Sequence, residues 1–254
     1  MVKKRIVGVV TIKNNWVVQS FGYKKYLPIG RPECIIENLD RWGADEILVQ
    51  VIDRSFYSKG PDFELLSRIG KLSLSTPIVY GGGIRDVNDA INVIKHGADR
   101  LIVDYILRNK LETIHELASS LGSQAIIASL PIYKVGNEVM IYNYETGKSD
   151  NIQEKILNVI FDKKNISEIL LINKNGEGYS DTFDINLLNA FPKTDISFIV
   201  FGGIHKQDLI NELLKHENIS AVAIGNFLNY KEHSIQSIKG ATSGNNIRNP
   251  DYYF

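Results

Sequence analysis

The stretches Ile78-Val-Tyr-Gly-Gly-Gly-Ile84 and Ile199-Val-Phe-Gly-Gly-Ile204 are two copies of one pattern, an apolar run that ends in consecutive glycines. Gly82 lies 120 residues before Gly202, and this spacing is close to half of the 254-residue chain. A pattern that recurs at a fixed spacing indicates an internally repeated architecture. The sequence therefore predicts a fold made of two similar halves.

Other segments keep the same order and nearly the same spacing. The further pairs of corresponding runs are Lys4–Thr11 with Gln124–Leu130, Gly43–Ile52 with Ile166–Ile172, and Leu101–Ile106 with Ala221–Leu228. Between the apolar runs lie segments whose apolar residues recur at helical spacing. These predicted helices cover residues 32–42, 86–96, 111–121, 152–160 and 209–214. Strand and helix patterns alternate eight times along the chain.

Strands that are apolar throughout are typical of parallel sheets buried on both faces, and helical connections between them favour right-handed crossovers. Eight strand and helix units with an internal two-fold repeat have no topological switch point, which favours a closed barrel over an open doubly wound sheet. The predicted fold is an α/β (β/α)8 TIM barrel made of two fused half-barrels. We expect one domain that spans residues 1–254.

The composition argues against several classes of protein. Apolar residues make up 44% of the chain, enough for a full core, and 29 basic residues balance 29 acidic residues. This balance predicts neither a nucleic-acid nor a membrane partner. Cys34 is the single cysteine, the five histidines show no metal-ligand spacing, and no apolar run approaches membrane length. We therefore expect a soluble cytoplasmic protein without a metal or another cofactor.

Chemistry in a barrel of this kind is expected where strands end and helices begin. Consecutive glycines at these junctions let backbone N–H groups approach an anion closely, and a following helix adds its dipole. The candidate phosphate-binding residues are Gly82, Gly83, Gly202, Gly203, Gly225 and Asn226. The alternative is that the glycines only form tight turns. Because the motif occurs twice, we favour phosphate binding, and a ligand with a phosphate at each end would suit two sites.

Many local motifs resemble those of the cyclase subunit of imidazole glycerol phosphate synthase, the HisF family. The similar positions run in register from residue 4 to about residue 230, and they are Arg5-Ile, Lys13, Gly43-Ala-Asp-Glu-Ile, Gly81-Gly-Gly-Ile84, Gly97-Ala-Asp-Arg100, Gly122-Ser-Gln-Ala125, Glu168-Ile-Leu-Leu171, Gly178, Gly202-Gly203 and Phe227. The resemblance implies the same barrel. It also adds Gly178 to the second phosphate site.

The resemblance implies two carboxylates that act as general acid and base in ring closure, one at the end of the first barrel strand and one at the end of the fifth. The matching positions are predicted to be Thr11 and Leu130, neither of which transfers protons at neutral pH. The nearest candidate carboxylates, Asp53 and Glu177, follow other strands. We therefore expect that no catalytic residue of the family is retained and that cyclase activity is lost.

The first phosphate site also departs from the family pattern. Asp104-Tyr105 takes the place of an Asn-Thr pair, and a carboxylate there would repel an anion. We therefore expect one bound phosphate group rather than two. It would lie at the second site, which consists of Gly178, Gly202, Gly203 and Gly225.

Four charged residues at strand starts match the ring that, in the resembled family, gates the passage of ammonia through the barrel. They are Arg5, Glu46, Arg100 and Glu168, with arginine in place of lysine at position 100. The resemblance also assigns contact with the glutaminase subunit to Asp99. The alternative is a cluster of salt bridges that plugs the barrel. Because these charges are kept while the catalytic end is altered, we favour the gate.

Delivery of ammonia through a dry barrel requires a glutaminase docked at the N-terminal face of the barrel, so we expect a HisH-like partner. The segment Lys24-Lys-Tyr-Leu-Pro-Ile-Gly-Arg-Pro32 resembles a HisF-like branch that lacks the cyclase carboxylates and serves the amidation of surface-polysaccharide sugars. That branch passes ammonia to a sugar amidotransferase, which converts an acetamido group into an acetamidino group. The chain would then be a conduit and a scaffold.

Two alternatives are a genuine cyclase of histidine biosynthesis with rearranged acids, and a non-catalytic barrel that binds a phosphate ligand above a sealed lower end. Two long connections rise from the catalytic face, residues 13–30 and 131–150. The first is predicted to be a lid, a docking pad or a solvated loop, and the second a hairpin that turns at Gly136-Asn137. The tail after Gly240 either packs across the barrel bottom or extends into solvent.

Overall fold

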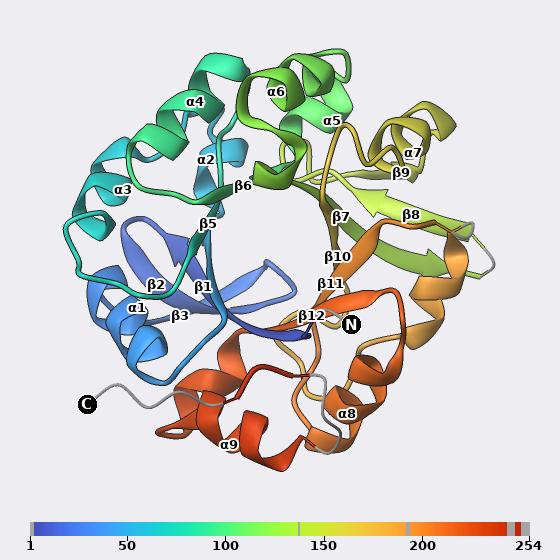
Figure 1. Ribbon diagram of the computed structural model, residues 1–254. Helices are drawn as coiled ribbons and strands as arrows, with labels where there is room; N and C mark the ends of the chain where they lie inside the picture. Colours follow the sequence, from blue (N-terminus) through green and yellow to red (C-terminus); the bar gives the residue numbers. More distant parts are fainter. Residues whose placement is uncertain (1–2, 137, 192–193, 243–246, 250–254) are drawn as a thin grey trace.

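Eight parallel strands close on themselves in the computed structural model, which describes residues 3–136, 138–191, 194–242 and 247–249. In the order in which they pair, they are β1 (Arg5–Lys13), β4 (Glu46–Val51), β5 (Ile78–Gly81), β6 (Arg100–Val103), β7 (Ile126–Val135), β10 (Glu168–Asn173), β11 (Ser197–Phe201) and β12 (Ile219–Ile224). Closure is made by β12, which pairs in parallel with β1. The predicted (β/α)8 barrel is confirmed (Figure 1).

Helices surround the barrel on its outside (Figure 1). The α-helices are α1 (Pro32–Arg41), α2 (Asp53–Phe56), α3 (Phe63–Ile69), α4 (Val87–Lys95), α5 (Tyr105–Asn109), α6 (Thr113–Leu121), α7 (Glu154–Ile160), α8 (Gln207–Lys215) and α9 (Ser234–Ala241). Short 3-10 helices are η1 (Ser123–Ala125), η2 (Ile185–Ala190) and η3 (Asn226–Tyr230). None of the helices in the described part of the chain is long and apolar enough to cross a membrane.

Local signals in the sequence position these helices well. Pro32 occupies the first turn of α1, and the Asp86 side chain accepts a hydrogen bond from the Asp89 backbone N–H at the start of α4. One unit differs from the regular alternation, because the described part of the connection from β10 to β11 contains η2 and no α-helix. Leu187 is the one buried residue of η2, so this segment lacks the apolar stripe that a packed α-helix needs.

The barrel has two separate hydrophobic layers. Side chains that point outward from the strands pack against the helices and form the larger layer. Side chains that point inward fill the interior, which we call the bore. They are Val7, Val9, Leu48, Val79, Ile102, Ile127, Leu170, Ile172, Ile199, Phe201, Ala221 and Ala223. The bore is therefore apolar between its lower end, where the strands begin, and its upper end, where they finish.

Two β-hairpins rise from the upper end. The first, β2 (Trp16–Phe21) with β3 (Lys25–Gly30), follows β1, so the long connection over residues 13–30 is a folded hairpin. The second joins the end of β7 to β8 (Glu138–Tyr142) and β9 (Ser149–Asn151), as predicted; of the predicted turn residues, Asn137 lies outside the described residues. Since β1 and β7 are the first barrel strands of the two halves, the hairpins occupy corresponding positions.

Candidate functional site at the two ends of the barrel

The four predicted gate residues form a closed ring at the lower end. Arg5 Nη1 lies 2.7 Å from Glu46 Oε1, and Arg5 Nη2 pairs with Glu168. Arg100 Nη1 lies 3.2 Å from Glu46 Oε1 and 2.8 Å from Glu168 Oε2. Each arginine thus contacts both glutamates, and all four side chains are at most 15% exposed. We call Arg5, Glu46, Arg100 and Glu168 the lower ring.

Further hydrogen bonds hold the lower ring in place. The Ser220 hydroxyl donates to Glu168, and Arg100 donates to the Gln124 carbonyl at 3.1 Å and to the Ser167 hydroxyl at 2.7 Å. Burial raises the pKa of Glu168, but the nearby arginines outweigh burial and hold that pKa below its ordinary value. The ring therefore consists of charged side chains and closes the bore in this conformation.

Asp99 lies beside the lower ring, at the rim of a hollow of about 1400 Å³ in the barrel bottom. Its Oδ2 accepts a hydrogen bond from the Ile78 backbone N–H at 2.8 Å, while the residue is exposed overall. Part of the tail also reaches this hollow, because Ile247 forms a bridge with Lys4 and the Arg248 N–H donates to the Lys4 carbonyl. The described piece of the tail thus packs at the barrel bottom.

The upper end departs from our expectation in one respect. Thr11 is buried where β1 finishes, opposite Gln50, but Leu130 does not face the bore. Leu130 pairs with Leu171 and packs in the outer layer, whereas the next residue, Pro131, pairs with the bore residue Ile172. The assignment of Leu130 was wrong by one residue, because a shift of one position along a strand exchanges its two faces. Pro131 has no ionisable group either.

Two carboxylates near the upper end are engaged elsewhere. Asp53 Oδ2 accepts a hydrogen bond from the Asn14 backbone N–H at 3.0 Å, so it holds the turn between β1 and β2. Asp104 pairs with Arg108 one helical turn later. Burial raises the pKa of Asp104 above its ordinary value despite this arginine. A buried carboxyl group at this position agrees with the expected loss of the first phosphate site.

Two tyrosines, one from each hairpin, meet above the bore. The Tyr23 ring packs on the bore residues, and its centroid lies 5.2 Å from that of Tyr144 in an edge-to-face arrangement. Burial raises the pKa of both hydroxyls well above the ordinary value. Between these rings and the strand ends only a cavity of about 70 Å³ is left, and Gln50, Asp104 and Ser129 are among its lining residues. Our sequence analysis missed this pair, because it involves two segments about half a chain apart.

The repeated glycines pack in the same way in both halves. A Cβ atom on Gly82 would lie 2.5 Å from the Val51 carbonyl oxygen, and one on Gly202 would lie 2.5 Å from the Asn173 carbonyl oxygen. A Cβ atom on Gly83 would likewise lie 2.5 Å from the Lys59 carbonyl oxygen. Both glycine pairs therefore permit close contact between neighbouring strand-to-helix connections.

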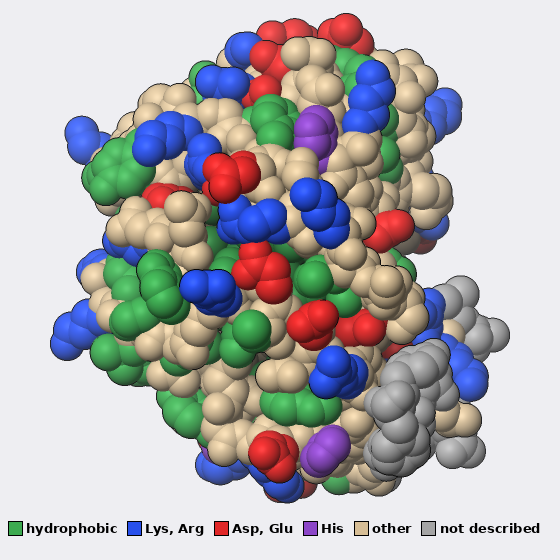
Figure 2. All heavy atoms as spheres, turned by 90° about the vertical axis from the view of Figure 1, so that its left-hand side faces the viewer, with side chains coloured by type: hydrophobic (Ala, Val, Ile, Leu, Met, Phe, Trp, Pro, Cys, Tyr) green, Lys and Arg blue, Asp and Glu red, His purple; other side chains and the backbone are tan. Residues whose placement is uncertain are grey.

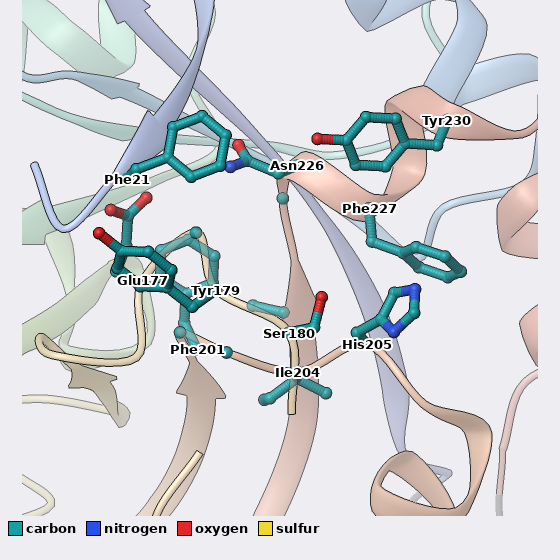
Figure 3. Close-up of a pocket in the computed structure, with 15 residues that line it drawn as sticks. Phe21, Glu177, Tyr179, Ser180, Phe201, Ile204, His205, Asn226, Phe227 and Tyr230 are labelled. Carbon is teal, nitrogen blue, oxygen red and sulfur yellow. The ribbon is translucent and has the colours of Figure 1, made fainter. Parts of the chain in front are cut away.

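The two halves differ in the space beside these glycines. Gly82 borders the 70 Å³ cavity, whereas the second pair borders a pocket of about 300 Å³ (Figure 3). All four residues predicted for the second phosphate site, Gly178, Gly202, Gly203 and Gly225, line this pocket, and so does the further candidate Asn226. His205 lies edge-on to Phe227 with ring centroids 4.1 Å apart, and its Nδ1 is 3.7 Å from Asp181 Oδ2. We call this pocket the anion pocket.

Glu177 lies between the anion pocket and the first hairpin. Its Oε2 accepts hydrogen bonds from the Ser20 hydroxyl and from the Tyr23 backbone N–H, each at 3.0 Å. Only 2% of the residue is exposed, and burial raises its pKa to about 7 despite these hydrogen bonds. Glu177 was predicted only as a candidate replacement acid. Its observed contacts make it a link between the pocket wall and the hairpin.

Comparison with known proteins agrees with this geometry. The family described as "Histidine biosynthesis protein" matches residues 5–234. The chain is 30% identical over 240 residues to "Putative imidazole glycerol phosphate synthase subunit hisF2" of Vibrio vulnificus, covering 94% of this chain and 88% of that protein. A protein of the same description from Campylobacter jejuni is 29% identical, over 81% of this chain and 82% of its own.

A third relative is "Imidazole glycerol phosphate synthase subunit HisF" of Thermococcus gammatolerans, which is 27% identical over 94% of both chains. The family match covers nearly all of the barrel, and these relatives are matched along most of their length. The chain therefore belongs to the histidine biosynthesis protein family and is HisF-like.

Proposed function

We propose that this chain is the conduit subunit of a cytoplasmic, glutamine-dependent amidotransferase complex. A HisH-like glutaminase docks at the lower end and releases ammonia, which crosses the bore and leaves at the upper end. There a sugar amidotransferase uses it to convert an acetamido group of a surface-polysaccharide sugar into an acetamidino group. The observation that carries the proposal is an apolar bore between a ring of four buried charges at its lower end and an upper end where Asp104, the acidic residue that lines the cavity, is paired with Arg108.

The chemistry of the bore suits ammonia. Uncharged ammonia loses little on entering an apolar space, whereas ammonium pays a large desolvation penalty. Ala221 and Ala223 narrow the bore less than the larger residues around them, and the polar strand residues Gln50 and Ser129 lie at the cavity near its upper end. Passage of ammonia from the lower end requires the salt bridges of the lower ring to open transiently. Arginine at position 100 keeps the positive charge that the gate needs.

The upper end supports a partner rather than a cyclase. Thr11 and Pro131 occupy the strand ends where an acid and a base would be needed, and Asp104 is paired with Arg108. Seven large hydrophobic side chains are exposed among the described residues, and all of them lie either at the upper end of a barrel strand or on a segment that follows one. They are Trp16, Leu27, Phe56, Tyr57, Val135, Tyr179 and Tyr230.

Exposed apolar side chains that gather on one face are typical of protein interfaces. Figure 2 shows hydrophobic side chains gathered on the left of the view. The hairpin formed by β2 and β3 adds Lys24 and Lys25, and no acidic residue lies between Lys13 and Pro32. We therefore assign the upper face to the acceptor enzyme, with an acidic surface opposite the hairpin.

The anion pocket is proposed to hold one phosphate-bearing group. Its glycine-lined wall and the Asn226 and His205 side chains offer donors to an anion. The closed lower ring favours a second candidate function, a barrel that binds a phosphate ligand and passes no ammonia. The names of the relatives favour a third, the cyclase of histidine biosynthesis. One set of measurements separates these three functions.

The decisive experiment mixes the chain with a HisH-like glutaminase and measures complex formation, glutaminase rate, and cyclase turnover of the histidine-pathway ribonucleotide substrate. The conduit function predicts a complex and a faster glutaminase without cyclase turnover. Asp99→Asn should weaken the complex, whereas Asp150→Ala, at an exposed acidic residue of the upper hairpin, should not. Cyclase turnover would establish the histidine-pathway function, and no complex would favour the stand-alone binding barrel.

A further inference from the structure

The end of the first hairpin, Ser20–Tyr23, is fastened to the wall of the anion pocket. We call these four residues the hairpin tip. Asn226 makes two hydrogen bonds to the Ser20 backbone, accepting from its N–H at 3.1 Å and donating to its carbonyl at 2.7 Å. The Gly22 N–H donates to the Glu177 carbonyl at 2.8 Å, and the Glu177 carboxyl group accepts from Ser20 and Tyr23. Two residues of the pocket wall therefore hold the whole tip.

The backbone of the pocket wall at Gly178 also fits closely against the hairpin tip. Gly178 has a φ of +82°, and a Cβ atom there would overlap with the Ser20 carbonyl oxygen and the Phe21 Cα atom. Only glycine allows this backbone conformation and this contact together. The Phe21 ring itself lines the pocket and lies edge-to-face with Tyr179, at a centroid distance of 6.2 Å (Figure 3). A ligand in the pocket would therefore touch the hairpin tip directly.

Tyr23, two residues after Phe21 in the same tip, covers the upper end of the bore. Tyr23 adopts a left-handed backbone conformation with φ of +53°, which is uncommon for a residue other than glycine. Its ring packs on the bore residues beside Tyr144, and its hydroxyl lies 3.4 Å from Gln50 Oε1. Phe21 in the pocket and Tyr23 over the bore are thus parts of one short segment, so a movement of its backbone displaces both rings.

We propose that the hairpin tip is a stopper of the bore controlled by the anion pocket: a phosphorylated ligand in the pocket holds Tyr23 over the bore, and its release lets the tip lift. A ligand can shift an equilibrium only through contacts that differ between the two states. A pocket occupant contacts Phe21 only while the tip is seated, so binding stabilises the closed state. The passage of ammonia through the opened bore and the binding of a phosphate group in the pocket rest on the proposed function; the covering of the bore by the hairpin tip does not.

Access to the bore can be measured on the isolated chain with a cysteine as probe. Cys34→Ser removes the single cysteine, and Ile102→Cys places a thiol on the bore beneath Tyr23. The readout is the rate at which a small uncharged methanethiosulfonate modifies this thiol. Tyr23→Ala and Tyr144→Ala should each raise the rate about tenfold or more, because either change removes a ring that covers the probe. His115→Ala, at an exposed position of α6 outside the stopper, should leave the rate unchanged.

The coupling is measured by adding ligand probes to the same protein. Glycerol 3-phosphate or inorganic phosphate at saturation should slow modification of the thiol when Tyr23 is present and have no effect in Tyr23→Ala. Unchanged rates in both tyrosine variants would overturn the stopper, and binding of a probe without slower modification would overturn the coupling. Because no glutaminase takes part, a failure of the ammonia function would leave these results intact.

A second measurement needs no substitution. Hydrogen exchange in the unaltered chain should slow across residues 17–27 when either phosphate probe binds, while α6 on the far side of the barrel keeps its exchange rate. Binding detected by calorimetry without this protection would overturn the proposal. Failure of both probes to bind would also overturn it, since the pocket would then lack the ligand class on which the control depends.

Discussion

The two ends of the bore are closed by opposite means. At the lower end the closure is ionic, and all four charged side chains come from barrel strands that the sheet holds rigidly. At the upper end the closure is aromatic, and both rings come from connections outside the barrel. A buried charge network tolerates little change, whereas a segment held by a few hydrogen bonds can move. This difference shows that residues of the barrel strands form the closure at the lower end, whereas residues of the two inserted hairpins form the closure at the upper end.

The largest effect should follow loss of a charge from the lower ring. Arg5→Ala would leave Glu46 and Glu168 buried with Arg100 as their shared partner, and breaking such a buried network costs about 3–5 kcal/mol of stability. Lys206→Ala, which removes an exposed partner of Asp181, should change stability by less than about 1 kcal/mol. Urea unfolding of both variants tests this contrast. Equal stabilities would mean that the ring is not a buried network.

A pH effect should come from Glu177 at the upper end. Its pKa rises from an ordinary 4.5 to about 7 in the fold, so the folded state holds its proton more tightly than the unfolded state. Its contribution to stability is therefore greatest below pH 4.5 and is lost as the pH rises through 7, by up to about 3 kcal/mol. In Glu177→Gln this part of the pH dependence should disappear. The prediction is checked by measuring the unfolding midpoints of both proteins at pH 5 and pH 8. Equal changes of the midpoint with pH in the two proteins would contradict it.

A smaller effect should follow when the seat of the hairpin tip is filled. Gly178→Ala and Gly136→Ala both place alanine at a positive φ, +82° and +60° respectively, but only the first would overlap with a neighbour. The strain from φ alone costs about 1 kcal/mol in each variant. The contact with Ser20 should make Gly178→Ala worse by a further 1–2 kcal/mol or so and speed hydrogen exchange across residues 17–27. Equal unfolding energies would show that the tip is not seated on Gly178.

The smallest effect should come from exchanging one cation of the lower ring for another. Arg100→Lys keeps the charge but loses the two donors that reach Gln124 and Ser167, which should cost about 1 kcal/mol of stability. Thermal unfolding at low and high salt gives the size of the loss. A loss as large as that of Arg5→Ala would show that hydrogen bonds rather than charge hold the ring together.

Sequence alone predicted the lower end better than the upper end, for a physical reason. Strand starts follow from hydrophobic pattern, and the family resemblance identified the charged ring, so Arg5 and Glu168 were placed together although 163 residues separate them. The second glycine pair and Asn226 were placed correctly in one pocket for the same reason. Leu130 was misplaced because one residue of register decides which face of a strand a side chain occupies.

The aromatic closure could not be predicted, because two flexible connections must fold and meet before Tyr23 and Tyr144 touch. The aromatic content of the first connection gave a hint of a lid, but nothing in the sequence pairs it with the second. Glu177 shows the same limit. Its position after a barrel strand suggested an acid, whereas its burial and its contacts with the hairpin tip depend on the folded insertion.

The bridge between Lys4 and Ile247 has a practical consequence for experiments on this protein. Both residues line the hollow at the barrel bottom, so an affinity tag joined directly to Lys4 or Ile247 would begin beside the surface assigned to the glutaminase. Such a tag would compete with the partner and could produce a false negative in a pull-down. A glutaminase fused genetically to the same end would, in contrast, start close to its docking place. The nature of the added sequence thus decides whether it obstructs the complex or helps to assemble it.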